Sequence, residues 1–201
     1  MLEVSKTGFI ESGYDERDHI LGMPSGGMDI PTECDYSCNI DVVKDQGNSM
    51  KCVPYSLCYA LETMHNLDGE DIFFDIDEVY NNRENKGEGM MIRDALKFLN
   101  KEGYDNGRKI SGYARLGSKL IMQYSLLANG PFVMALPVRS TEEDFWNGSD
   151  YQGGHAICCV GYDEEGFILM NSWGRGFGYS GKCILPYDQM NNIIEAWTVL
   201  A

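Results

Sequence analysis

Four residues of this chain have side chains that together could perform acyl transfer. Cys52 could act as a nucleophile, His155 as a base, and Asn171 as the residue that orients the base. The side-chain amide of Gln46, which lies shortly before Cys52, could donate a hydrogen bond to an oxyanion. Cysteine, histidine and asparagine each lie in a glycine-containing segment, which core packing alone does not explain. The pattern predicts chemistry through a thioester on Cys52.

The sequence around these residues resembles that of the papain-like cysteine peptidases, most closely the compact bacterial, archaeal and viral type. Residues 45–47 (Asp-Gln-Gly), four further residues and then Cys52 are similar to the segment that leads to the family's nucleophile. Residues 154–162, which begin Gly-His-Ala, are similar to the strand that carries the family's histidine. Residues 171–178, which begin Asn-Ser-Trp-Gly, are similar to the family's asparagine and glycine loop.

The resemblance extends from about Asp15 to about Gln189 and implies an α+β, papain-like two-lobe fold. It implies a helical N-terminal lobe, an antiparallel β-barrel-like C-terminal lobe, and an active-site cleft between the lobes. The change from helical to strand-like patterns along the chain is consistent with this architecture. We expect one domain over residues 1–201, with a wrapping segment at 1–44, a helical lobe at about 45–105 and a mainly β lobe at about 106–201.

The resemblance also implies which residues bind substrate. They are Gly89, Met90, Met91, Gly153, Gly154 and Trp173. The backbone of Gly89 would bind a peptide as an added strand. Met90 and Met91 would line an apolar specificity pocket, although core residues at a helix start are an equally good interpretation. The two glycines before His155 suggest close approach of another chain segment, or a simple bend. Trp173 would shield the bond between His155 and Asn171 from water, or belong to the core.

Two departures from the family pattern predict altered specificity rather than loss of activity. His155 follows Cys52 by 103 residues, against the ~130–150 typical of the family. Val53 and Pro54 follow the nucleophile where the family usually has an aromatic residue. Neither departure removes a chemical group, and the shorter spacing predicts shorter loops and a smaller or more open cleft.

Local patterns predict the elements that position these residues. Cys52 would lie at the start of a helix at about 50–66, capped by Ser49, where the helix dipole stabilises a thiolate. Pro54 is tolerated because it falls in the first turn. Further helices are expected at 75–82, 90–101 and 120–129. Strands are expected at 109–116, 132–138, 156–162 and 167–171, with edge strands at 182–185 and 196–199.

Composition and charge exclude several classes of partner. The chain has 201 residues, 43% of them hydrophobic, and a net charge of -15. So acidic a protein is not expected to bind nucleic acid or an anionic membrane. No stretch approaches the ~20 apolar residues of a membrane-spanning helix. We expect a monomer that acts on a protein or peptide substrate and needs neither metal nor cofactor.

The N-terminus and the cysteines indicate where the protein acts. Residues 1–13 have no apolar core of a signal peptide, which predicts a cytoplasmic or virus-encoded protein. A family propeptide is much longer than the residues before the match, so the sequence predicts no self-inhibiting segment. The seven cysteines are an odd number, and Cys34 and Cys38 could form a disulfide. Ser49 or Met50 replaces a cysteine that secreted members pair, which favours a reducing compartment.

The predicted function is a cysteine-type endopeptidase with Cys52, His155, Asn171 and Gln46 as its catalytic residues. The same residues also serve non-proteolytic acyl transfer, as in a transpeptidase, deamidase or cell-wall amidase. A catalytically silent papain-like binding module is a further alternative, although such copies usually lose one of these groups.

Overall fold

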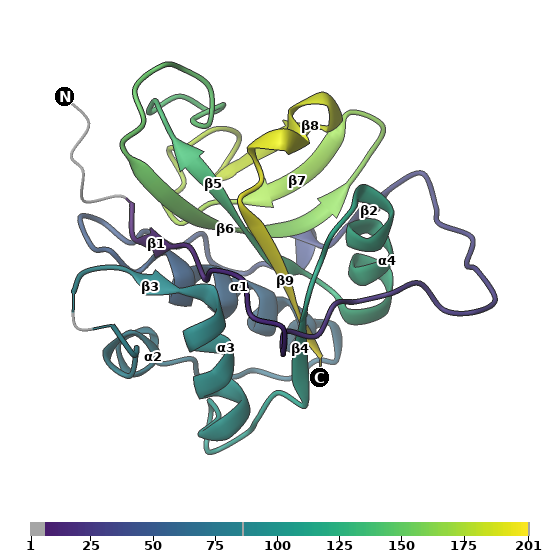
Figure 1. Cartoon of the computed structure of the whole chain (residues 1–201), viewed down its shortest axis with the longest axis horizontal. Helices are drawn as coiled ribbons and strands as arrows, with labels where there is room; N and C mark the ends of the chain where they lie inside the picture. Colours follow the sequence, from purple (N-terminus) through teal and green to yellow (C-terminus); the bar gives the residue numbers. More distant parts are fainter. Residues whose placement is uncertain (1–6, 86, 201) are drawn as a thin grey trace.

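A single mixed β-sheet connects most parts of the molecule (Figure 1). The computed structural model describes residues 7–85 and 87–200. The strands of this described part are β1 (Phe9–Ile10), β2 (Cys34–Asp35), β3 (Met90–Met91), β4 (Gly112–Arg115), β5 (Phe132–Val138), β6 (Gly153–Tyr162), β7 (Gly166–Met170), β8 (Lys182–Pro186) and β9 (Glu195–Leu200). Their main order is β3-β1-β6-β5-β9-β4, and β7 and β8 continue from β6.

Helices lie against this sheet, and most agree with the sequence pattern. They are α1 (Cys52–Leu67), α2 (Ile76–Asn81), α3 (Ile92–Lys101) and α4 (Lys119–Asn129), with 3-10 turns η2 (Ser37–Asn39) and η3 (Tyr187–Asn192). The carboxylate of Asp75 caps α2, and the hydroxyl of Ser118 caps α4. None of the helices in the described ranges is both long and apolar enough to cross a bilayer.

The start of α1 differs from the prediction in one respect. Its N-cap is Lys51, which makes no side-chain capping bond. Ser49 does not cap the helix, because its hydroxyl instead donates to the carbonyl oxygen of Gln46 at 2.7 Å. Pro54 does fall in the first turn, as predicted.

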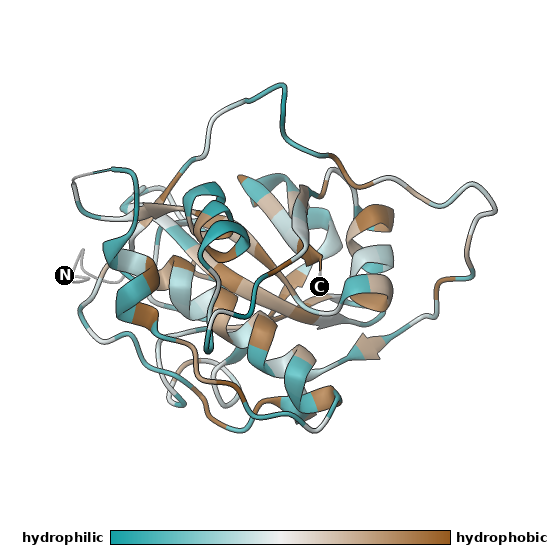
Figure 2. Ribbon diagram, turned by 90° about the horizontal axis from the view of Figure 1, so that it is seen from below, coloured by the Kyte–Doolittle hydropathy of each residue, from teal (hydrophilic) through white to brown (hydrophobic). Residues whose placement is uncertain are grey.

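Strand β5 separates two hydrophobic cores because its side chains alternate between the faces of the sheet. Val133 and Ala135 belong to the core shared with α1 and α3. Phe132, Met134 and Leu136 belong to the core on the opposite face. Figure 2 shows hydrophobic and hydrophilic residues alternating along the helices, as expected for elements that bury one face.

The sheet is open, so the predicted barrel-like C-terminal lobe is wrong in that respect. The physical reason is that β6 pairs with four strands, β1, β2, β5 and β7, and the sheet therefore branches. The register between β6 and β7 shifts between Cys159 and Gly161. The prediction of an edge strand is confirmed for β8, which pairs only with β7 among the described strands. It is wrong for β9, which lies between β5 and β4. The predicted division near residue 105 stays a prediction.

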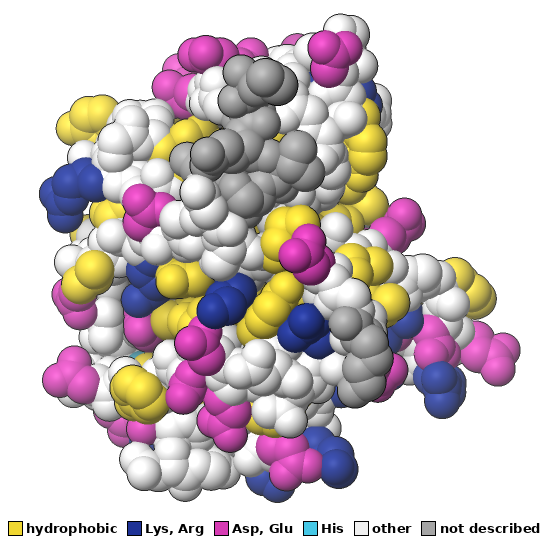
Figure 3. Space-filling model, turned by 90° about the vertical axis from the view of Figure 1, so that its left-hand side faces the viewer, with side chains coloured by type: hydrophobic (Ala, Val, Ile, Leu, Met, Phe, Trp, Pro, Cys, Tyr) yellow, Lys and Arg dark blue, Asp and Glu magenta, His cyan; other side chains and the backbone are white. Residues whose placement is uncertain are grey.

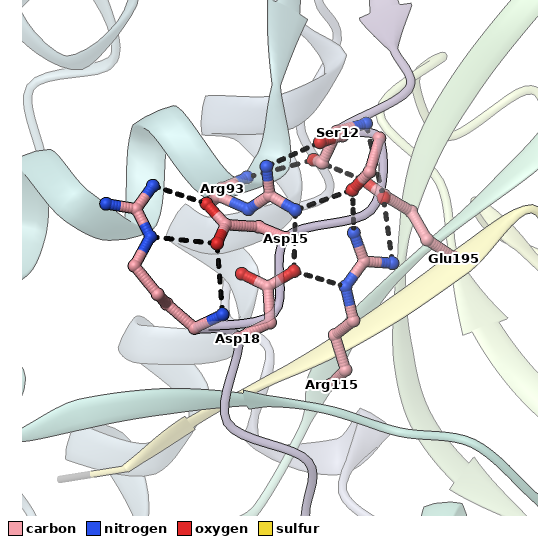
Figure 4. Close-up of polar contacts among 8 residues, drawn as sticks. Ser12, Asp15, Asp18, Arg93, Arg115 and Glu195 are labelled. Atoms are coloured by element: carbon pink, nitrogen blue, oxygen red, sulfur yellow. Dashed lines mark hydrogen bonds and ion pairs between the residues drawn. The ribbon is translucent and has the colours of Figure 1, made fainter.

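An ionic network fastens the N-terminal segment to three elements of the fold (Figure 4). Arg93 on α3 donates to the carbonyl oxygen of Ser12 at 2.5 Å and to Asp18 at 2.6 Å. Arg115 on β4 donates to the same Asp18 carboxylate at 2.8 Å. The hydroxyl of Ser12 donates to Glu195 on β9 at 2.7 Å. Since the side chains of Asp18 and Glu195 are almost fully buried, these bonds are shielded from solvent.

Candidate active site

Cys52 is the first residue of α1 and has no exposed surface. Burial raises the pKa of its thiol to about 12, although hydrogen bonds from the backbone amides of Ala156, Val53 and Cys52 itself act in the opposite direction. The amide of Ala156 places the thiol beside the segment that carries His155. Burial therefore favours the neutral thiol, and the thiolate stabilised by the helix dipole stays a prediction.

His155 and Asn171 lie on neighbouring strands and form a buried hydrogen bond. His155 is in β6, and Asn171 directly follows β7. The Nε2 atom of His155 is 2.8 Å from Oδ1 of Asn171. Oδ1 also accepts the backbone N–H of Ser172 at 2.8 Å, which identifies it as the carbonyl oxygen. Nε2 therefore carries the proton, and Nδ1 is the nitrogen able to exchange a proton with a nucleophile.

Gln46 is buried, and both the nitrogen and the oxygen of its side-chain amide form hydrogen bonds. Its Nε2 atom donates to the carbonyl oxygen of Ser49 at 2.7 Å, and its Oε1 atom accepts the hydroxyl of Ser172 at 2.6 Å. A primary amide has two N–H groups, so one remains to serve a ligand. Ser172 thus contacts both Gln46 and Asn171. Nothing local in the sequence marks Ser172, because its contact with Gln46 joins residues 126 positions apart.

Aromatic rings surround the imidazole of His155. The ring of Trp173 lies 4.6 Å from it between centroids, and the ring of Phe145 meets it edge-on at 5.6 Å. Phe177 packs against both Trp173 and Phe145. These apolar rings exclude water from the bond between His155 and Asn171, which strengthens it. Trp173 was anticipated here, whereas Phe145 was missed because its loop between β5 and β6 has no periodic pattern.

The residues predicted to bind substrate surround part of the chain itself. We call residues 7–10 the groove strand, because they lie between β3 and β6 (Figure 1). The amide of Gly8 donates to Gly154 at 3.1 Å, and the carbonyl oxygen of Gly8 accepts from Met90 at 2.8 Å. Gly89 approaches Gly8 so closely that a Cβ at residue 89 would lie 2.8 Å from its carbonyl oxygen. Backbone pairing of this kind is how an extended peptide is held at the edge of a sheet.

Side chains of the groove strand fill the predicted specificity pocket. Phe9 belongs to the same buried cluster as Cys52, Met90 and Ala156. A Cβ at Gly154 would meet the Phe9 ring, and one at Gly153 would lie 3.0 Å from Thr7. Met91 pairs in register with Ile10 and is only partly buried. The predicted substrate-binding glycines and methionines therefore do come together, with the chain's own residues between them.

The expectation of no self-inhibiting prosegment stays a prediction, while residues 7–10 of the chain itself lie among the predicted substrate-binding residues. The segment is too short for its sequence to reveal it, since β1 contains only two residues. The predicted pairing of Cys34 with Cys38 is also absent. All seven cysteines fall within the described ranges, and all are free thiols.

Comparison with known proteins shows which fold this is. Xylellain, a cysteine protease from Xylella fastidiosa, superposes with a TM-score of 0.85 at 22% identity, over 98% of this chain and 96% of that one. The chain has the papain-like fold. Procathepsin B from Trypanosoma congolense has a TM-score of 0.80 at 14% identity, over 98% of this chain and 86% of that one. A cysteine protease of Carica candamarcensis in complex with E-64 gives 0.65 at 17% identity, over 85% and 99%.

Comparison by sequence also finds a short match. A peptidase C1-like protein of Acanthamoeba polyphaga mimivirus is 49% identical over 37 residues. The match covers 17% of this chain and 12% of the length of that protein. No family model matches the chain. The papain-like fold is therefore established by the structure, and the activity is argued from the site.

Proposed function

We propose that the chain is a cysteine-type peptidase that cleaves peptide bonds through a thioester on Cys52. The observation that carries this proposal is the buried bond between His155 and Asn171, which directs the Nδ1 side of the ring away from Asn171. The Cys52 thiol lies beside the backbone of the next residue, Ala156. An oriented imidazole next to a thiol at a helix N-terminus is the arrangement that activates a cysteine nucleophile.

In the proposed reaction, Nδ1 of His155 takes the proton of Cys52, and the thiolate attacks the peptide carbonyl carbon. The backbone N–H of Cys52 and the side-chain amide of Gln46 stabilise the resulting oxyanion. His155 then gives its proton to the leaving amine, and a thioester remains on Cys52. A water molecule, deprotonated by His155, hydrolyses the thioester and restores the thiol.

We further propose that the enzyme is an endopeptidase. The groove strand is internal to the chain, so the groove accepts an extended backbone that has residues on both sides. The net charge of -15 favours peptides that carry basic residues beyond the apolar pocket. On the face shown in Figure 3, acidic side chains are interspersed with Lys and Arg. The protease names of the papain-like structural neighbours support the activity.

Labelling with an epoxysuccinyl thiol-protease inhibitor tests the proposal. We expect one inhibitor molecule to attach to Cys52, slowly because the groove strand covers it, as shown by intact mass and peptide mapping. The His155→Ala variant should react at least about 10-fold more slowly, because its thiol lacks the base that takes the proton. Labelling scattered over several of the seven cysteines, at the same rate in both proteins, would contradict the proposal.

Ser172→Ala should lower kcat by about 10-fold, because the loss of one hydrogen bond releases the amide of Gln46. The value of KM should change little, since the hydroxyl of Ser172 bonds to Gln46 and not to a predicted substrate-binding residue. Steady-state hydrolysis of a fluorogenic peptide measures both constants. Ser125→Ala is the matched control, because Ser125 is a fully buried serine on α4, away from the site. Equal losses in the two variants would show that Ser172 has no role in the reaction.

A further inference from the structure

Tyr59 lies on the same helix as Cys52 and packs against the sheet. The two residues are seven positions apart, so they lie on the same face of α1 two turns from each other. The Tyr59 side chain is 1% exposed and belongs to a small buried cluster with Cys158, Val160 and Met170 of β6 and β7. The ring therefore reaches from the nucleophile's helix to the strands that carry His155 and precede Asn171.

The hydroxyl of Tyr59 joins two segments that are distant in sequence. It accepts the backbone N–H of Lys44 at 2.5 Å and donates to the carbonyl oxygen of Asn171 at 3.3 Å. Lys44 lies two residues before Gln46. A tyrosine hydroxyl can accept one hydrogen bond while it donates another, which no apolar ring can do. One atom of α1 is thus bonded to the segment that carries Gln46 and to Asn171 itself.

These two segments also bind each other. The backbone N–H of Gly174 donates to the carbonyl oxygen of Lys44 at 3.0 Å, and the backbone N–H of Gln46 donates to the carbonyl oxygen of Ser172 at 2.8 Å. These bonds flank an antiparallel bridge between Asp45 and Trp173. One side of this short ladder contains Gln46, the predicted oxyanion donor. The other side directly follows Asn171, which orients His155. A salt bridge between Lys44 and Glu62 at 2.7 Å also ties one side of the ladder to α1. The Tyr59 hydroxyl differs from it because it bonds to both Lys44 and Asn171.

We propose that Tyr59 is a positioning residue for acyl transfer, whose hydroxyl holds the Gln46 segment and Asn171 in register with Cys52. This inference rests on the proposed function. Tyr59 does not touch the reacting atoms, and it acts through Gln46 and Asn171. Small displacements of catalytic groups reduce the rate because an oxyanion donor and a base act only within hydrogen-bond distance.

The Tyr59→Phe variant tests the proposal, because it keeps the ring and removes only the hydroxyl. We expect kcat to fall about 10-fold with KM nearly unchanged, as for the loss of one buried hydrogen bond that matters in the transition state. Tyr162→Phe is the matched control, since Tyr162 is fully buried on β6 and its hydroxyl donates to the carbonyl oxygen of Pro31 at 3.0 Å. A loss of thermal stability in both variants, with kcat unchanged in Tyr59→Phe, would overturn the assignment.

A double-mutant cycle separates a positioning role from a general structural one. Gln46→Ala alone should lower kcat by about 100-fold or more, as for other side-chain oxyanion donors. In that background Tyr59→Phe should cost clearly less than in the wild type, because part of its effect passes through Gln46. The same fold-change in both backgrounds would show that Tyr59 acts independently of the Gln46 segment and would overturn the proposal.

A second measurement keeps this test separate from the proposed function. The rate of Cys52 alkylation by iodoacetamide is followed against pH in wild type and Tyr59→Phe, which requires no peptidase activity. We expect the profile to shift, because Asn171 orients the imidazole that takes the thiol proton. Absence of peptide hydrolysis by the wild type would overturn the proposed function, and an unchanged alkylation profile would overturn the role of Tyr59.

Discussion

Replacing Cys52 with alanine is expected to reduce peptide hydrolysis by at least about 10⁴-fold, because no other group can form the acyl intermediate. The geometry around Cys52 supports an effect of this size. The other groups of the site are held by bonds that do not involve its sulfur, among them the bond between His155 and Asn171. The variant should therefore fold normally and lose the chemical step alone. Initial rates with a fluorogenic peptide, at matched concentrations of active protein, measure the loss.

Cys183→Ala is the control for this substitution. Cys183 is also buried, but it lies on β8 and does not belong to the cluster around Tyr59. Its removal should cost on the order of 1–2 kcal/mol of stability through the cavity it leaves, with kcat within about threefold of the wild type. Residual activity in Cys52→Ala comparable to that of the control would refute the assigned nucleophile.

Gly8→Val is expected to increase activity, because it expels the groove strand from the site. A Cβ at residue 8 would overlap the backbone carbonyl of Met50, which cannot move away as a flexible side chain could. The strand is held by two backbone hydrogen bonds of Gly8 and by burial of Phe9. These contribute roughly 3–5 kcal/mol together, so kcat/KM and the rate of inhibitor labelling should rise by between about 100-fold and several thousandfold, since each ~1.4 kcal/mol is a factor of ten.

Gly22→Val is the matched control, since a Cβ at residue 22 meets no other atom within 4 Å. Equal rates in wild type, Gly8→Val and Gly22→Val would mean that the groove strand already leaves the site readily. A lower rate in Gly8→Val, with unchanged thermal stability, would contradict the placement of the substrate in this groove.

The same variant should change the titration of the nucleophile. Burial holds the pKa of the Cys52 thiol high, at about 12, and the thiolate fraction rises as pH approaches that value. Water that enters the opened groove would solvate the thiolate and lower this pKa. The midpoint of the alkylation profile should therefore move to lower pH in Gly8→Val and stay in place in Gly22→Val.

The elements with strong periodic patterns were predictable from the sequence. The helix that begins near Cys52, the strand 132–138 and the turn between β6 and β7 follow from spacing, turn residues and length. Cys52, His155 and Asn171 could be singled out because each lies in a distinctive local motif. The structure brings His155 and Asn171 into direct contact and places Cys52 beside them.

The features that the sequence did not predict depend on contacts between distant residues. Ser172 and Tyr59 bond to groups 126 and 112 positions away, and such bonds leave no periodic signal. The groove strand pairs with β3 and β6 through Gly8 and a two-residue element, which is too short for any pattern. The open sheet follows from the sharing of β6 by four strands, which depends on register rather than on composition.

The network around Arg93 determines what a cut in the N-terminal segment would release. Ser12, Gly13 and Asp18 remain bonded to Arg93, Arg115 or Glu195 however the residues before them are removed. Scission after Ile10 would thus leave an anchored new terminus, while the groove strand would lose its covalent link to the molecule and could depart. After dilution the released peptide would not rebind, so one cleavage would open the covered site permanently. The ionic network around Arg93 and Arg115 would stay intact.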